Sequence, residues 1–409
     1  MTDVRRAAPA APRRNHLAML FAGWFLVDVD LIVITPLLVP VSGHFHADLS
    51  TVTLALTAYL LLFGLMQPVY GNYSDSVGRV RVLRIGLFGL FAANLVAGLA
   101  PNLAVLIAAR GAAGAFAGAV VPVTGAYVGD LVAPQRRRQA MAGLLSASAL
   151  GVATGTIGGG LLADLMSWRV AIGLVAAAAL VLALLYGRLP EVIVSKSRRA
   201  FALSRIGEAL RSGWFRFLVA FTFVEGASMV GFYNFFNAAL QVHGNPALVA
   251  GLVTSSYGAG AVAGGLLVRA VHTRVSAAAM FGVGTALLTL GYAAAAYSQG
   301  IPSILVASVL SGMALSTAQS TIQDWTIAAA PVQVRGTAAS LIACAVFTGG
   351  AVSTAAVSGF AADGRFGVLF AVAAMVTAPI AVVGTFARYA FDTHQARITD
   401  NAPSGKPLG

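Results

Sequence analysis

Long apolar stretches follow one another through almost the whole chain, and each is long enough to cross a lipid bilayer. A helix needs about 20 predominantly apolar residues to span the hydrocarbon core. Twelve stretches meet this length, at residues 15–41, 50–71, 80–100, 103–128, 138–163, 167–188, 213–241, 247–269, 276–298, 301–328, 335–360 and 366–388. In lipid, a spanning helix satisfies its own backbone polar groups. The chain is therefore predicted to be an all-α membrane protein with twelve transmembrane helices.

The few charged residues support this prediction and orient the helices. Charged residues make up 10% of the chain, whereas soluble proteins carry about 25%. With the helices placed as above, every Lys and Arg except Arg110, Arg169 and Arg365 lies on one side of the membrane. The positive-inside rule predicts that this side and both termini face the cytoplasm. The net charge of +12 follows from this distribution and brings contact with acidic lipid headgroups, and no nucleic-acid partner is expected.

The two halves of the chain repeat each other at an offset of 197 residues. Ala133-Pro134 precedes the fifth helix as Ala330-Pro331 precedes the eleventh, and Asp28 aligns with Glu225. Such a parallel duplication predicts two pseudo-symmetric six-helix bundles. The expected parts are a cytoplasmic tail (1–14), a first bundle (15–188), a basic amphipathic linker along the membrane surface (189–212), a second bundle (213–388) and a polar, disordered tail (389–409).

A charged loop bracketed by glycines lies between the second and third helices. Gly71, Asp75, Gly78 and Arg79 follow the spacing Gly-x-x-x-Asp-x-x-Gly-Arg. This loop resembles the signature of the major facilitator superfamily, whose members are two-bundle transporters that work by alternating access. The resemblance implies that the loop helps to close the cytoplasmic side when the cavity faces outward. The residues assigned to this cytoplasmic gate are Gly71, Asp75, Gly78, Arg79, Arg138, Asp324 and Arg335.

Two further motifs are similar to those of the same family. In the fourth helix, Arg110 and Gly114 match the pattern Arg-x-x-x-Gly. The fifth helix carries a glycine-rich pattern that is associated with the drug:proton antiporter branch, although Thr156 stands where that branch has proline. Small residues let neighbouring helices approach closely in lipid. The glycines assigned to helix packing are Gly151, Gly155 and Gly159.

Four acidic residues lie inside or near the depth of the apolar stretches, namely Asp28, Asp30, Glu225 and Asp324. A carboxylate at mid-membrane costs about 3 kcal/mol on insertion scales. Burial also disfavours its ionised form, so such a group can bind and release a proton as its access to water alternates. The residues assigned to proton coupling are Asp30, Asp28, Glu225 and Arg110.

Several roles remain open at this stage. Arg110 needs a buried counter-ion, which either Asp28 or Asp30 can provide, and the pair acts as a proton-operated switch or as a static link between helices. Glu225 either carries a proton or makes a structural hydrogen bond, and Asp324 is either a functional acid or a gate charge.

Aromatic and amide side chains recur at helical spacing around these acids. They line a substrate cavity or belong to the packed core; beside a buried acid, aromatic rings suit amphipathic organic cations. The residues assigned to the cavity are Trp24, Ile32, Tyr59, Met229, Phe232, Tyr233, Phe236, Tyr257, Gln319 and Gln323.

Other functional classes lack their motifs in this sequence. No Gly-x-x-x-x-Gly-Lys-Ser/Thr loop for ATP occurs, nor does His-Glu-x-x-His or Gly-x-Ser-x-Gly. Cys344 is the single cysteine, which excludes a disulfide or thiolate metal site within one chain. Neither a cofactor nor a metal is therefore expected.

The resulting hypothesis is a proton-coupled exporter of drugs or natural products, a monomer in the inner (plasma) membrane of a bacterial-type cell. Its partners are a small-molecule substrate, protons and the lipid bilayer. Alternatives are a transporter of a sugar, nucleoside or amino acid, and, in another class, a transporter-like sensor or a membrane enzyme.

Overall fold

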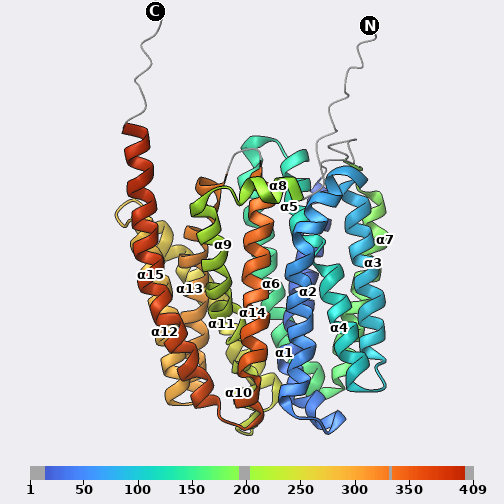
Figure 1. Ribbon diagram of the computed structural model, residues 1–409. Coiled ribbons are helices and arrows are strands. Elements are labelled where there is room, and N and C mark those ends of the chain that lie inside the picture. Colours follow the sequence, from blue (N-terminus) through green and yellow to red (C-terminus); the bar gives the residue numbers. More distant parts are fainter. Residues whose placement is uncertain (1–13, 193–202, 331–333, 401–409) are drawn as a thin grey trace, which may run out of the picture.

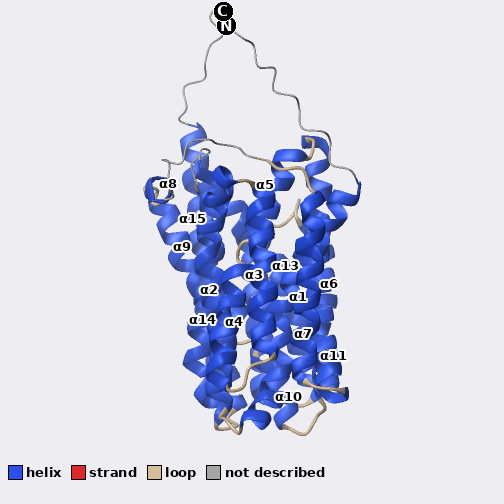
Figure 2. Ribbon diagram, turned by 90° about the vertical axis from the view of Figure 1, so that its right-hand side faces the viewer, coloured by secondary structure: helices blue, strands red, loops and turns tan. Residues whose placement is uncertain are grey.

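The computed structural model describes residues 14–192, 203–330 and 334–400. Within these ranges the regular structure is helical (Figures 1 and 2). The helices of the first part are α1 (Arg14–Phe45), α2 (Leu49–Val77), α3 (Arg79–Gly98), α4 (Leu103–Ala117), α5 (Val120–Leu131), α6 (Pro134–Leu165), α7 (Trp168–Leu185) and η1 (Tyr186–Arg188). Those of the second part are α8 (Leu203–Ala209), α9 (Gly213–Gly226), η2 (Ala227–Gly231), α10 (Phe235–Val242), α11 (Ala247–Val271), α12 (Ala277–Tyr297), α13 (Ile301–Ala329), α14 (Arg335–Ala362) and α15 (Phe366–Asp400).

Twelve helical segments are long and apolar enough to cross a membrane, and each coincides with one of the predicted stretches. Two of these spans are composite: α4 and α5 form the fourth, and α9, η2 and α10 form the seventh. The predicted twelve-helix, all-α architecture is confirmed. The chain is a multi-pass membrane protein.

The bundle has two chemically different ends. We call the end where α1 begins and α15 ends the basic end; it is at the top in Figure 1 and carries Arg79, Arg188 and Arg335. The opposite end, which carries the turns after α1, α3 and α10, is called the far end.

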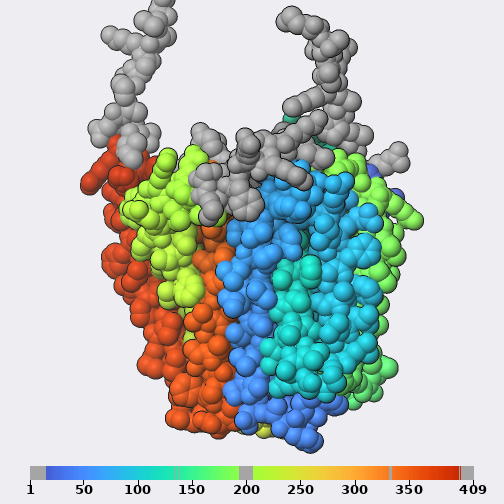
Figure 3. Space-filling model, turned by 45° about the vertical axis from the view of Figure 1, so that its right-hand side comes forward, coloured from blue at the N-terminus to red at the C-terminus, as the bar shows by residue number. Residues whose placement is uncertain are grey.

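Each half of the chain forms a bundle, and two helix pairs join the bundles. In the first half α1 packs against α6, α2 against α4, and α3 against α7. In the second half α13 packs against α11 and α12, and α12 against α15. Extensive contacts between α2 and α14, and between α6 and α11, hold the halves together. Figure 3 shows α2, in blue, directly beside α14, in orange.

The fourth and seventh spans are interrupted for local reasons. Between α4 and α5, the ring nitrogen of Pro122 has no N–H to donate to the carbonyl of Gly118, four residues earlier, so the helix is broken there. In the seventh span, η2 is a π-helical turn directly after Glu225 and Gly226. Such turns leave backbone carbonyls that need other donors.

The last helix differs from the sequence-based expectation at its end. A polar tail was expected from residue 389, but α15 continues to Asp400. Arg388 pairs with Asp392 one turn later at 3.2 Å, and Phe391 is buried against Trp325. These contacts extend the helix beyond the apolar stretch. Of the predicted linker, residues 193–202 lie outside the described ranges, and α8 follows them.

Candidate functional site

A fully buried ion pair joins α1 to α4. Arg110 Nη1 donates to Asp30 Oδ1 at 2.7 Å, and Arg110 Nη2 donates to the backbone carbonyl of Asp30, also at 2.7 Å. Neither side chain is exposed. Asp30, rather than Asp28, is thus the counter-ion of Arg110.

Asn94 of α3 completes this pair. Its amide nitrogen donates to Asp30 Oδ1 at 2.9 Å, and its oxygen accepts from Arg110 Nη1 at 2.8 Å. The ring of Tyr59 from α2 lies beneath the guanidinium, 4.4 Å from its centre. The network therefore links four helices of the first half. Asn94 was missed in the sequence because one amide in an apolar stretch carries no distinguishing signal.

Asp28 occupies a different face of α1. It is half-buried, and its carboxylate interacts with Ser148 of α6 and with Trp24, one turn earlier on α1. Its Oδ2 atom has no hydrogen-bond partner within the described part of the chain. Asp28 and Asp30 therefore have separate surroundings, as their two-residue spacing on one helix requires.

Glu225 is the buried acid of the second half. Its side chain is 1% exposed, and neither carboxylate oxygen has a hydrogen-bond partner among the described residues. Tyr257 of α11 lies within electrostatic range of both Glu225 and Asp28, and its ring packs 4.8 Å from that of Tyr233. The structure thus brings the repeat-related acids of the two halves near one tyrosine.

The π-helical turn beside Glu225 is held by side chains from neighbouring helices. Ser353 of α14 donates to the carbonyl of Ala227 at 2.9 Å, and Thr354 donates to the carbonyl of Gly231 at 3.3 Å. Tyr292 of α12 donates to the carbonyl of Ser228. These donors compensate for the irregular backbone, so the position of Glu225 depends on two neighbouring helices of the second half, α12 and α14. This turn was not predicted from the sequence.

The residues assigned to the cavity are divided by the structure. Met229, Phe232 and Tyr233 are buried on the span that carries Glu225. Phe236 is also buried on this span, where it packs against Tyr233, Tyr292 and Phe370. Four further members of the set have other surroundings: Ile32 lies against Gly155 of α6, Trp24 and Gln319 are half-buried, and Gln323 is exposed.

The glycines of the fifth span lie where α6 crosses α1. A Cβ atom at position 155 would be 2.8 Å from the Val29 carbonyl oxygen, so only glycine allows this approach. Gly151 meets Phe25 and Asp28 in the same way, and Gly159 meets Val33 and Pro36. The crossing fixes the rotation of α1 that separates Asp28 from Asp30.

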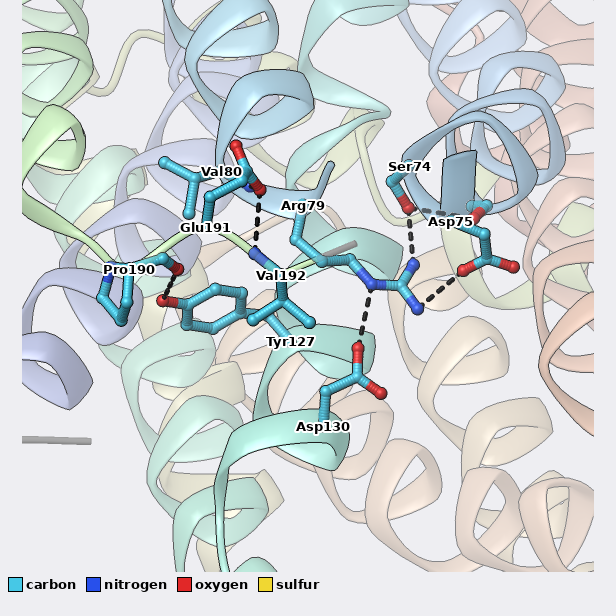
Figure 4. Close-up of polar contacts among 10 residues, drawn as sticks. Ser74, Asp75, Arg79, Val80, Tyr127, Asp130, Pro190, Glu191 and Val192 are labelled. Carbon is cyan, nitrogen blue, oxygen red and sulfur yellow. Dashed lines mark hydrogen bonds and ion pairs between the residues drawn. The ribbon is translucent and has the colours of Figure 1, made fainter. Parts of the chain in front are cut away.

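Arg79 anchors a polar cluster at the basic end (Figure 4). Its guanidinium contacts Asp75 at 2.6 Å, the hydroxyl of Ser74 at 2.6 Å and Asp130 of α5 at 3.1 Å. All of these partners belong to the first half. Ser74 and Asp130 were not singled out in the sequence, because their proximity to Arg79 depends on how α5 ends beside α2.

Glu191, just after η1, is part of the same region (Figure 4). Its carboxylate accepts from the backbone N–H groups of Val80 and Arg81 in the first turn of α3, at 2.9 and 3.0 Å. Gly78, directly before α3, has a φ of 116°, a conformation that L side chains rarely adopt. The start of the linker is thereby attached to the loop between α2 and α3.

The other residues assigned to the gate are placed as follows. Gly71 of α2 approaches Ser340 of α14, since a Cβ atom there would lie 3.2 Å from the Ser340 hydroxyl. Asp324 and Arg335 are exposed. The side chain of Arg138 is outside the described residues.

Comparisons with known proteins agree with this architecture. The sequence model of the family described as Major Facilitator Superfamily matches residues 20–354. A puromycin resistance protein of Streptomyces alboniger is 32% identical over 160 residues, which cover 39% of this chain and 32% of that protein. A lincomycin resistance protein of Streptomyces lincolnensis is 33% identical over 171 residues, which cover 40% of this chain and 35% of that protein. The chain thus spans about a third of the length of these relatives.

Solved structures share the fold over nearly the whole chain. A bacterial homologue of the human lysosomal transporter Spinster, inward-facing and unoccupied, has a TM-score of 0.70 at 16% identity and covers 92% of this chain and 97% of its own. A nucleoside transporter has a TM-score of 0.74 at 13% identity, with coverages of 91% and 99%. At such identities the likeness shows the fold alone.

Proposed function

The chain belongs to the Major Facilitator Superfamily of membrane transporters, and we propose that it exports small organic cations in exchange for protons. Two of its relatives are named as antibiotic resistance proteins, which supports export of a small organic molecule. The basic end is assigned to the cytoplasm by the positive-inside rule. The proposed setting is the plasma membrane of a bacterial-type cell, with the chain acting as a monomer.

The observation that carries the proposal is the buried carboxylate of Glu225, which has no hydrogen-bond partner in the described part of the chain. An isolated ionised carboxylate is strongly disfavoured in an apolar interior. Glu225 is therefore stable when it holds a proton or when a cation lies against it. A proton and a cationic substrate then compete for the same group, and this competition is the physical basis of exchange.

Asp28 supports the same mechanism from the first half. It also has a carboxylate oxygen without a hydrogen-bond partner among the residues that the structure describes, and Tyr257 lies within electrostatic range of both Asp28 and Glu225. A tyrosine ring near two carboxylates suits a cation that also carries apolar groups, through contact with the face of the ring. We assign Asp28, Glu225 and Tyr257 to the substrate-binding region.

The Asp30–Arg110 pair is assigned to coupling in the first half. A proton on Asp30 would remove the negative charge that holds Arg110, and the released guanidinium would then repel a cationic substrate. Proton binding would thereby be communicated to the substrate region through α1, which carries both Asp28 and Asp30.

Proton flux in proteoliposomes tests the proposal. Purified protein would be reconstituted with a pH-sensitive dye inside, and cationic, neutral and anionic compounds would be added in turn. Wild type is expected to move protons only with cations. Glu225→Gln, which preserves shape but cannot ionise, is expected to abolish this flux.

The control variant is Asp363→Asn, which alters an acid after the end of α14, away from the buried acids. It should behave as wild type. Cation-driven proton flux that persists in Glu225→Gln would contradict the role of Glu225. Proton flux that is independent of substrate charge would contradict the proposed substrate class.

A further inference from the structure

The carboxylate of Asp164 connects the two halves at the far end. Asp164 lies in the last turn of α6, in the first half, and accepts from the backbone N–H groups of Ala247 and Leu248. The distances are 3.2 Å to Oδ1 and 2.8 Å to Oδ2. These two donors form the first turn of α11, in the second half.

The first turn of α11 needs an acceptor that its own sequence does not supply. The first N–H groups of a helix have no partner within the helix and are usually capped by a polar side chain directly before it. That position holds Pro246, whose side chain cannot accept a hydrogen bond. A carboxylate is also attracted by the partial positive charge of a helix N-terminus. Asp164 therefore caps α11 from the opposite half.

The backbones of α6 and α11 approach each other closely beside this contact. A Cβ atom at Gly160, one turn before Asp164, would lie 2.3 Å from the Ala247 carbonyl oxygen. Two more hydrogen bonds join the halves at the same end: Asn237 donates to Thr35 at 3.3 Å, and Gln241 donates to the Pro36 carbonyl at 3.0 Å. Residues 31–38 and 231–240 are buried throughout. These contacts close the far end. Among the hydrogen bonds named here, those of Asp164 are the ones made by a carboxylate.

We propose that Asp164 is a positioning residue for transport, a latch whose cap on α11 stabilises the state in which the far end is closed. A cap within one half would survive when the two halves rock against each other. This one joins α6 to α11 across the halves, so both of its hydrogen bonds break when the far end opens. The inference rests on alternating access of the fold and not on the identity of the substrate.

Distances between spin labels test the latch. Cysteines replace the exposed far-end residues Leu99 and Tyr297, one in each half, in a Cys344→Ala background. A second pair, Gln139→Cys and Arg269→Cys, reports on the exposed basic end. Double electron–electron resonance would be measured in lipid nanodiscs without substrate.

Removal of the cap should favour the far-open state. In Asp164→Ala, the ratio of far-open to far-closed molecules is expected to rise about fivefold, the effect of losing a typical N-cap. The basic-end pair should shorten in the same molecules, because rocking closes one end as it opens the other. Asp164→Asn retains one of the two acceptor oxygens and loses the negative charge, so it is expected to give a ratio between those of wild type and Asp164→Ala.

The matched control is Asp363→Ala, which removes an acid of the same charge that follows the end of α14. It should leave both distances unchanged. Unaltered distances in Asp164→Ala would overturn the proposal. An equal shift in Asp363→Ala, or in Asp164→Asn, would also overturn it, since surface charge rather than the cap would then be responsible.

Discussion

Arg110 is held 2.7 Å from Asp30, with both side chains completely buried, and Asn94 hydrogen-bonds to both. The pair connects residues 80 positions apart and lies on two helices that do not follow each other in the chain. Breaking a buried ion pair by removing one partner leaves a charge without compensation. The stability of the first half therefore depends on both members being present.

A double-mutant cycle tests this dependence. Asp30→Ala and Arg110→Ala are each expected to destabilise the protein by about 3–5 kcal/mol, because each leaves one buried charge. The double variant should be less destabilised than the sum of the two, since neither charge remains. Denaturant unfolding in a mild detergent, followed by tryptophan fluorescence, would measure the free energy of unfolding of the three variants. If the effects of the two single substitutions simply add in the double variant, the two residues do not interact.

Gly114 sets the distance between α4, which carries Arg110, and α2. A Cβ atom at this position would lie 2.2 Å from the Tyr59 carbonyl oxygen. Gly114→Ala is expected to destabilise by about 1–3 kcal/mol, as overpacking does. Gly125→Ala, where no atom lies within 4 Å of the added carbon, should be neutral or stabilising, because alanine favours helix. If Gly114→Ala and Gly125→Ala changed the unfolding midpoint equally, close packing at the crossing of α4 and α2 would not be the cause of the destabilisation.

Glu191 caps α3 from the start of the linker. Glu191→Ala is expected to cost about 1 kcal/mol, as the loss of an N-cap does. Amide hydrogen exchange should become faster at Val80 and Arg81, whose N–H groups lose their acceptor. Glu208→Ala, on α8 in the same linker region, serves as the comparison. Unchanged exchange in Glu191→Ala would show that the cap does not protect the start of α3.

The architecture could be predicted because its causes act within each segment. The length of an apolar stretch and the internal hydrogen bonding of a helix in lipid decide the number of spans, and the structure confirms all twelve. The end of α15 was missed because Arg388 and Phe391 are stabilised by neighbours that hydropathy does not record. The π-helical turn after Glu225 was missed for a similar reason, as its donors come from α12 and α14.

The sequence by itself therefore determined the helical spans, the duplication and the family, and it revealed the embedded charges because a charge inside an apolar stretch is conspicuous. Only the tertiary structure decided that Asp30 pairs with Arg110, that Asn94 joins them and that Asp164 caps a helix of the other half. These choices depend on which helices are neighbours and how each is rotated about its axis. Close crossings, such as that of α6 over α1 at Gly155, fix those rotations, and they involve residues far apart in the chain.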